Sequence, residues 1–126
     1  MTVLVDTSVL IDHLAGNTDA RQALRTAADS GRRVAASVVT KVEVLAGMRP
    51  AEEPKTRRLL DVTDWIDVDE EIAEQAGALA NQYLRSHPGV DAIDYIIAAT
   101  AQALDADLWT TSFKHFPMFP QPVSPY

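Results

Sequence analysis

The sequence contains no cysteine, which excludes disulfides, thiolate zinc sites and cysteine nucleophiles. It also lacks any apolar run near the roughly 20 residues needed to cross a bilayer. The short apolar start is interrupted at Asp6, whereas a signal peptide requires a basic start and a longer apolar stretch. Repeats and low-complexity segments are missing as well. We therefore expect a soluble, cytoplasmic protein.

Positive charge is also scarce. The chain carries 11 Lys and Arg against 18 Asp and Glu, for a formal net charge of −7. This excess of negative charge argues against a protein that binds nucleic acid through a basic surface. It does not exclude an enzyme whose acidic side chains bind a divalent metal, because a bound ion reverses the local field. The 126 residues, 47% of them hydrophobic, predict one globular domain over residues 1–126.

Short apolar segments alternate with segments of helical character. Strands are predicted at 3–5, 34–37, 65–68 and 107–110, and helices after Asp6, at 18–28, 40–47, 53–62, 70–84 and 92–104. The proline-rich segment 117–126 is interpreted as a closing tail. This alternation predicts an α/β fold, with a parallel sheet covered by helices on both faces. In such folds the functional crevice lies beyond the C-terminal ends of the strands, where Asp6, Ser37 and residues 110–112 are expected.

Three carboxylates are candidate functional groups, and each also has a purely structural explanation. Asp6 ends an apolar strand and is either a helix N-cap or a functional acid; Thr7 or Ser8 can serve as the cap in its place. Glu43 is either the capping-box partner of Thr40 or a side chain aimed into the crevice. These two roles can coexist.

Asp94 heads a helix that is almost entirely apolar, where a charged residue needs an explanation. Stabilisation by the helix dipole is one explanation and a metal site is the other. Asp91, three residues earlier, is a helix cap, an auxiliary ligand or a solvated side chain. Oxygen donors without cysteine suit Mg²⁺ or Mn²⁺ rather than Zn²⁺. The hydroxyls of residues 110–112 can hold water or a phosphate oxygen, and His115 is either a base or a packed residue.

Residues 5–12, 37–47 and 94–101 resemble, in this order, the three motifs of PIN-domain ribonucleases. The length and spacing are most similar to the VapC toxins of bacterial type II toxin–antitoxin systems. The resemblance implies a three-layer α/β/α sandwich and a Mg²⁺- or Mn²⁺-dependent endoribonuclease that cleaves RNA, often transfer or ribosomal RNA. It also implies that Asp6, Glu43 and Asp94 are the catalytic, metal-binding acids, with Thr7 or Ser8 lining the same site.

One segment departs from the family pattern, which commonly ends in Thr-x-Asn-x-x-Asp-Phe. Here Thr110 is retained, but Ser112 stands in place of Asn and His115 in place of Asp. The fourth ligand position is therefore open, with Asp91 as an auxiliary candidate.

The resemblance further implies partners. These are a homodimeric or toxin–antitoxin assembly, and a cognate antitoxin whose Arg or Lys reaches the carboxylates. Two alternatives remain at this point: another Mg²⁺-dependent phosphoester hydrolase, and a degenerate, non-catalytic module of the same fold.

Overall fold

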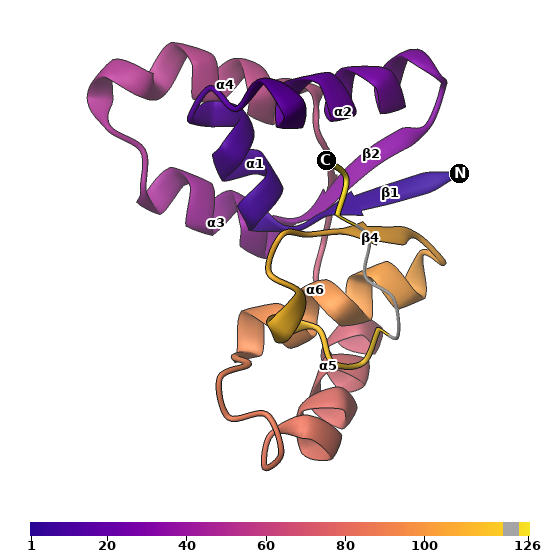
Figure 1. Ribbon diagram of the computed structural model, residues 1–126. Coiled ribbons are helices and arrows are strands. Elements are labelled where there is room, and N and C mark those ends of the chain that lie inside the picture. Colours follow the sequence, from indigo (N-terminus) through magenta and orange to yellow (C-terminus); the bar gives the residue numbers. More distant parts are fainter. Residues whose placement is uncertain (120–123) are drawn as a thin grey trace.

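A computed structural model describes residues 1–119 and 124–126. Four short strands form one parallel sheet in the order β3-β2-β1-β4. They are β1 (Thr2–Val5), β2 (Arg33–Ser37), β3 (Asp64–Ile66) and β4 (Asp107–Trp109). The six α-helices of the described chain are α1 (Thr7–Leu14), α2 (Thr18–Asp29), α3 (Val38–Ala46), α4 (Glu53–Val62), α5 (Glu70–Tyr83) and α6 (Ala92–Ala103). Figure 1 shows this arrangement, which confirms the predicted parallel α/β fold.

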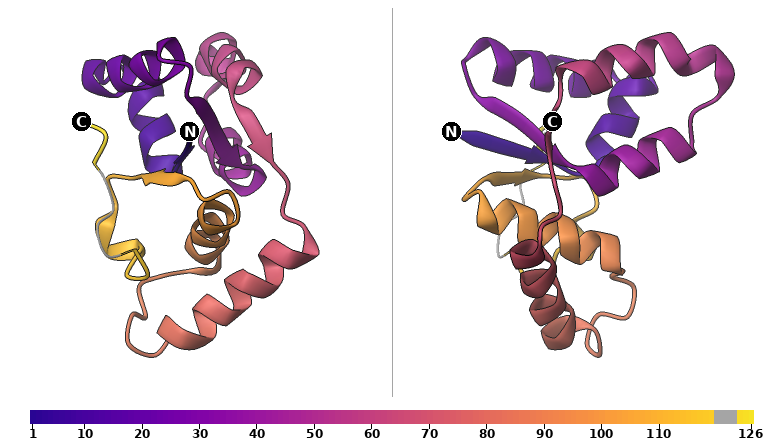
Figure 2. Two further views of the ribbon diagram at one scale, coloured as in Figure 1. Left: turned by 90° about the vertical axis from the view of Figure 1, so that its right-hand side faces the viewer. Right: turned by 180° about the vertical axis from the view of Figure 1, so that it is seen from behind.

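The sheet separates two apolar clusters, because successive side chains of a strand point to opposite faces. On one face Val3 and Val5 pack with side chains from α1, α2 and α4. On the other face Leu4 packs with α5 and α6. Figure 2 shows helices on both sides of the sheet, so the molecule has the three layers implied by the family resemblance.

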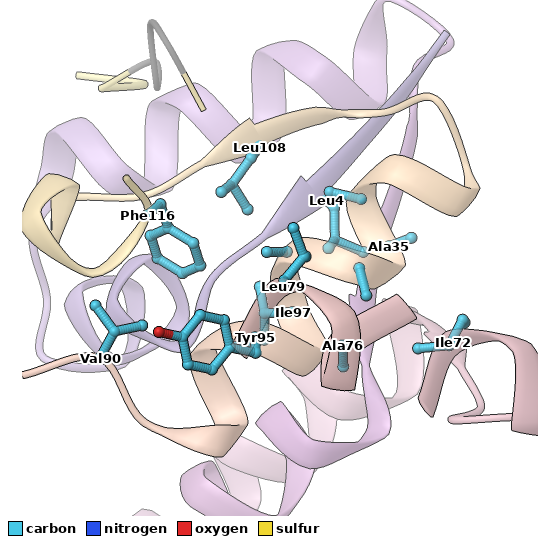
Figure 3. Close-up of a cluster of buried hydrophobic side chains, with 13 residues drawn as sticks. Leu4, Ala35, Ile72, Ala76, Leu79, Val90, Tyr95, Ile97, Leu108 and Phe116 are labelled. Carbon is cyan, nitrogen blue, oxygen red and sulfur yellow. The ribbon is translucent and has the colours of Figure 1, made fainter. Parts of the chain in front are cut away.

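Tyr95 lies at the centre of the second cluster and is 2% exposed. Figure 3 shows its ring among Val90, Ile97 and Phe116. Phe116, also fully buried, belongs to the segment that follows β4, so that segment is anchored in the core beside the start of α6.

The boundaries of α2, α5 and α6 agree with the predicted ranges to within one residue, and of the three roles left open for Asp91 the structure shows the cap. Asn17 caps α2, Asp69 caps α5 and Asp91 caps α6, each by accepting a hydrogen bond from a backbone N–H in the first turn. Gly31, in the loop between α2 and β2, has a φ of +81°, a conformation that glycine adopts at little cost. Helix α4 covers the predicted residues, 53–62.

The structure settles one capping alternative and overturns one capping prediction. Asp6 is the N-cap of α1, as one of its two alternatives stated, so neither Thr7 nor Ser8 serves as the cap in its place. Ser37 caps α3, which begins at Val38, so the predicted capping box between Thr40 and Glu43 does not form. The buried hydroxyl of Ser37 at the strand end starts the helix three residues early, and this leaves Glu43 in the second turn with its carboxylate free for a contact outside its own helix.

Two further observations concern the predicted tail and the possibility of a membrane-spanning helix. Part of the predicted closing tail, residues 120–123, lies outside the described residues. No helix within 1–119 and 124–126 is long and apolar enough to cross a membrane.

Candidate active site

Strands β1, β2 and β4 are parallel, so their C-terminal ends meet at one edge of the sheet. Asp6 follows β1, Ser37 ends β2 and Thr110 follows β4. All three side chains are buried there. The predicted crevice position is therefore where these polar side chains gather.

Asp6 is 5% exposed and is held by three hydrogen bonds. Its Oδ1 accepts from the backbone N–H of Thr7 at 2.8 Å. Its Oδ2 accepts from the hydroxyls of Ser8 at 2.9 Å and Thr110 at 2.8 Å. Asp6 thus combines the two roles considered from the sequence: it caps α1, and its second oxygen lies in a cluster of hydroxyls.

The segment after β4 closes this hydroxyl cluster. Thr110 Oγ1 accepts a 2.9 Å hydrogen bond from the backbone N–H of Ser112, and Ser8 Oγ accepts one of 3.2 Å from Thr111. Ser112 therefore contributes through its backbone. These bonds fix the loop after β4 against the start of α1.

Glu43 is joined to the same cluster through Thr7. The Thr7 hydroxyl donates a 2.6 Å hydrogen bond to Glu43 Oε1, and it lies 3.1 Å from the hydroxyl of the buried Thr40. Thr40 thus lies next to the candidate site, although the sequence pattern indicated only a helix-capping role for it. The one available signal was its position a single helical turn from Glu43, which places both side chains on the same face of α3.

Asp94 stands apart from these contacts. It forms a capping box with Asp91, in which Asp94 N donates to Asp91 Oδ1 at 3.1 Å and Asp91 N donates to Asp94 Oδ2 at 3.2 Å. Burial raises the pKa of the Asp94 carboxyl to about 6, partly offset by the hydrogen bond from the Asp91 backbone. No hydrogen bond between described residues joins Asp94 to Asp6 or Glu43. Asp91 is exposed and acts as a cap.

His115 lies beside Asp94. Its Nδ1 is 3.5 Å from Asp94 Oδ2. The residue ends a short 3₁₀ helix, η2 (Phe113–His115), that follows the hydroxyl-bearing loop after β4. The structure thus places the predicted residues in two groups: Asp6, Thr7, Ser8, Glu43 and Thr110 in one, and Asp91, Asp94 and His115 in the other.

The chemistry of these donors fits a divalent cation. Asp6 and Asp94 are buried carboxylates, and within residues 1–119 and 124–126 neither they nor Glu43 form an ion pair with Lys or Arg. No three Asp, Glu or His side chains of that part of the chain lie together in a metal-holding group. Such a group is not required for Mg²⁺, which commonly uses one or two carboxylates together with water and substrate phosphates.

Several Lys and Arg side chains contact other parts of the fold rather than the acids of the candidate site. Arg32 pairs with Asp107 at 2.6 Å and stacks over Trp109. Arg33 pairs with Asp64, and Lys55 donates to the Leu14 carbonyl at the end of α1. None of these groups offsets the charge of the acids at the sheet edge.

Comparison with known proteins agrees with the geometry. The family model described as "PIN domain" matches residues 3–113. The chain is 43% identical over 123 residues to Ribonuclease VapC19 of Mycobacterium tuberculosis, covering 98% of both chains. It is also 43% identical to Ribonuclease VapC10 of the same species, covering 98% of this chain and 92% of that protein.

Solved structures show the same fold. A toxin–antitoxin complex from Klebsiella pneumoniae contains a chain that is 32% identical with a TM-score of 0.79, and 98% of each chain is covered. A chain of VapBC2 from Rickettsia felis, bound to a promoter DNA fragment, has a TM-score of 0.82 at 20% identity, with 95% of this chain and 94% of that chain covered.

Proposed function

The chain belongs to the PIN domain family, and from this membership we propose that it is a metal-dependent endoribonuclease that acts as the toxin of a toxin–antitoxin pair. The observation that carries the proposal is 43% identity over nearly the whole chain to proteins named ribonucleases. The buried, cation-poor acids at the C-terminal edge of the sheet support it, because a metal-dependent nuclease needs acidic side chains that can bind a divalent ion near the phosphodiester.

Asp6, Asp94 and Glu43 are the residues we assign to the metal site, with Mg²⁺ or Mn²⁺ as the ion. When bound, such an ion activates water and neutralises charge on a phosphodiester. The chain's own contribution is to orient the carboxylates. The hydroxyls of Ser8 and Thr110 hold Asp6 Oδ2, and the hydroxyl of Thr7 orients Glu43.

The test is Asp6→Asn. Asparagine caps a helix as well as aspartate does, so its amide oxygen can still accept from Thr7 N while the negative charge is removed. We expect RNA cleavage in Mg²⁺ to fall by about 100-fold or more, since loss of a ligand charge removes several kcal/mol of stabilisation. Melting temperature in chelator should stay close to that of the unchanged protein.

Asp69→Asn is the matched control. Asp69 caps α5 through a 2.8 Å hydrogen bond from Ile72 N, and it shares no hydrogen bond with the three acids. This variant should cleave RNA normally. Undiminished cleavage by Asp6→Asn would reject the site. Turnover of small phosphomonoesters without RNA cleavage would favour another phosphoester hydrolase, and no cleavage by the unchanged protein in either metal would favour a non-catalytic module.

We also propose that a cognate antitoxin binds this chain, as the names of its structural relatives describe for those complexes. A hollow of about 620 Å³ between α1, α2 and α4 offers a surface of suitable chemistry. Its lining combines apolar side chains such as Leu14 and Leu59 with the cations Arg21, Arg25, Lys55 and Arg58. An apolar segment carrying acidic residues fits such a surface.

A further inference from the structure

His115 lies beside the buried Asp94 carboxylate. The side chain of His115 is 48% exposed, whereas that of Asp94 is 12% exposed. The two are 3.5 Å apart through His115 Nδ1 and Asp94 Oδ2, and no hydrogen bond joins them. One nitrogen of the imidazole thus lies within ion-pair distance of a carboxylate without a hydrogen bond between them.

The separation agrees with two donors of one metal ion. Neighbouring ligands of an octahedral ion with bonds of about 2.1 Å lie about 3 Å apart. A charge-assisted hydrogen bond would instead bring the two atoms to about 2.8 Å. The spacing of 3.5 Å leaves room for a shared ion after a small side-chain adjustment.

The backbone holds His115 at this position. Its N–H donates to the Ser112 carbonyl at 3.0 Å, and the next residue, Phe116, is buried in the core. Ser112 is in turn bonded to Thr110, whose hydroxyl contacts Asp6. The loop that carries His115 is therefore tied to Asp6 through Thr110 on one side and anchored in the core by Phe116 on the other.

We propose that His115 supplies an imidazole nitrogen to the divalent cation held beside Asp94, and that this nitrogen shifts the metal preference of the site from Mg²⁺ toward Mn²⁺. The inference rests on the proposed function in that both place the ion at Asp94. Mg²⁺ selects oxygen donors, whereas imidazole strengthens binding of the transition metals relative to Mg²⁺.

Metal binding without RNA tests this directly. Pulsed electron paramagnetic resonance of bound Mn²⁺ should show coupling to a ¹⁴N nucleus in the unchanged protein. In His115→Asp the coupling should disappear, and the ratio of Mn²⁺ to Mg²⁺ affinity measured by calorimetry should fall by about tenfold. Aspartate keeps a donor at this position, so the variant separates loss of nitrogen from loss of a ligand.

His87→Gln is the matched control. His87 is exposed, its Nδ1 lies 2.8 Å from the Ser86 hydroxyl, and it forms no ion pair with a carboxylate within residues 1–119 and 124–126. This variant should keep both the nitrogen coupling and the affinity ratio. Circular dichroism of each variant verifies folding before the metal measurements.

The outcomes separate the two proposals. Absence of Mn²⁺ binding or of nitrogen coupling in the unchanged protein, or coupling that persists in His115→Asp, overturns the role of His115. If Asp6→Asn still abolishes cleavage in that case, the ribonuclease proposal stands and only the inference about His115 is lost.

Discussion

The Thr7 hydroxyl donates a 2.6 Å hydrogen bond to Glu43 Oε1, and this bond joins the first turn of α1 to the second turn of α3. Thr7 directly follows Asp6, whose Oδ1 accepts from the Thr7 backbone N–H. Thr7 therefore fixes the carboxylates of Asp6 and Glu43 relative to each other.

Thr7→Val removes the hydroxyl while keeping the size and β-branched shape of the side chain. Loss of a hydrogen bond to a charged group is worth about 1.5 kcal/mol, so we expect RNA cleavage to fall by about tenfold. Initial rates on a defined RNA at saturating Mg²⁺ measure the effect. Thr7→Ser, which restores the hydroxyl, should recover most of the rate, and a Thr7→Val protein of normal activity would show that Glu43 needs no such support.

Asp94 predicts a pH dependence of stability in the absence of metal. Burial raises its pKa in the folded protein to about 6, above the ordinary 3.8, so the folded state binds this proton more tightly than the unfolded state. The stabilisation is therefore present below about pH 4 and is lost as the pH rises through 6. Asparagine cannot ionise, so the Asp94→Asn protein does not lose this stabilisation as the pH rises. At pH 7 its free energy of unfolding should exceed that of the unchanged protein by about 2 kcal/mol.

Urea denaturation in chelator at pH 4 and pH 7 measures this difference. The two proteins should have nearly equal free energies of unfolding at pH 4 and differ at pH 7. Equal stabilities at both values would mean that the carboxylate of Asp94 is better solvated than its position in the fold indicates.

Tyr126 predicts a stability effect that does not involve the three acids of the candidate site. The Tyr126 hydroxyl donates to Asp12 Oδ2 at 2.5 Å, and burial together with this carboxylate raises the pKa of the phenol. Tyr126→Phe should lower the free energy of unfolding by about 1.5 kcal/mol. The double variant with Asp12→Asn should cost less than the sum of the single changes, and strict additivity in this cycle would argue against a direct interaction.

Antitoxin binding should depend on the hollow between α1, α2 and α4. Val62 lines it and is 79% exposed, so Val62→Asp adds a charge to the surface without disturbing the core. We expect affinity for the co-expressed cognate antitoxin to fall by about tenfold or more, with RNA cleavage unchanged. Leu84→Asp, at an exposed apolar position that does not line this hollow, is the control, and an equal effect of both variants would place the antitoxin elsewhere.

The sequence predicted those features that depend on local patterns. Asp69 caps α5 as expected because an acidic residue immediately precedes a helical stretch, and the same position of Asp91 before α6 made the cap one of its three candidate roles. The start of α3 was predicted less well, since Ser37 and Thr40 are both good N-caps and the pattern favoured the wrong one. The choice depended on where β2 ends, which is set by pairing with β1 and β3.

The contacts within the candidate site could not be predicted in the same way. The bond between Thr7 and Glu43 spans 36 positions and that between Asp6 and Thr110 spans 104. Such pairings follow from the order of strands in the sheet, which no local pattern determines. The sequence could therefore name the participating residues through a family resemblance, but it could not predict that Asp94 and His115 form a group of their own.

The position of β4 at the edge of the sheet beside β1 has a consequence for synthesis of the chain. Asp6 is synthesised 104 positions before its partner Thr110. The segment carrying His115 is made later still. A nascent chain therefore carries its first acid without the loop that completes its surroundings, so the site is assembled only after Thr110 has been synthesised and β4 has paired with β1.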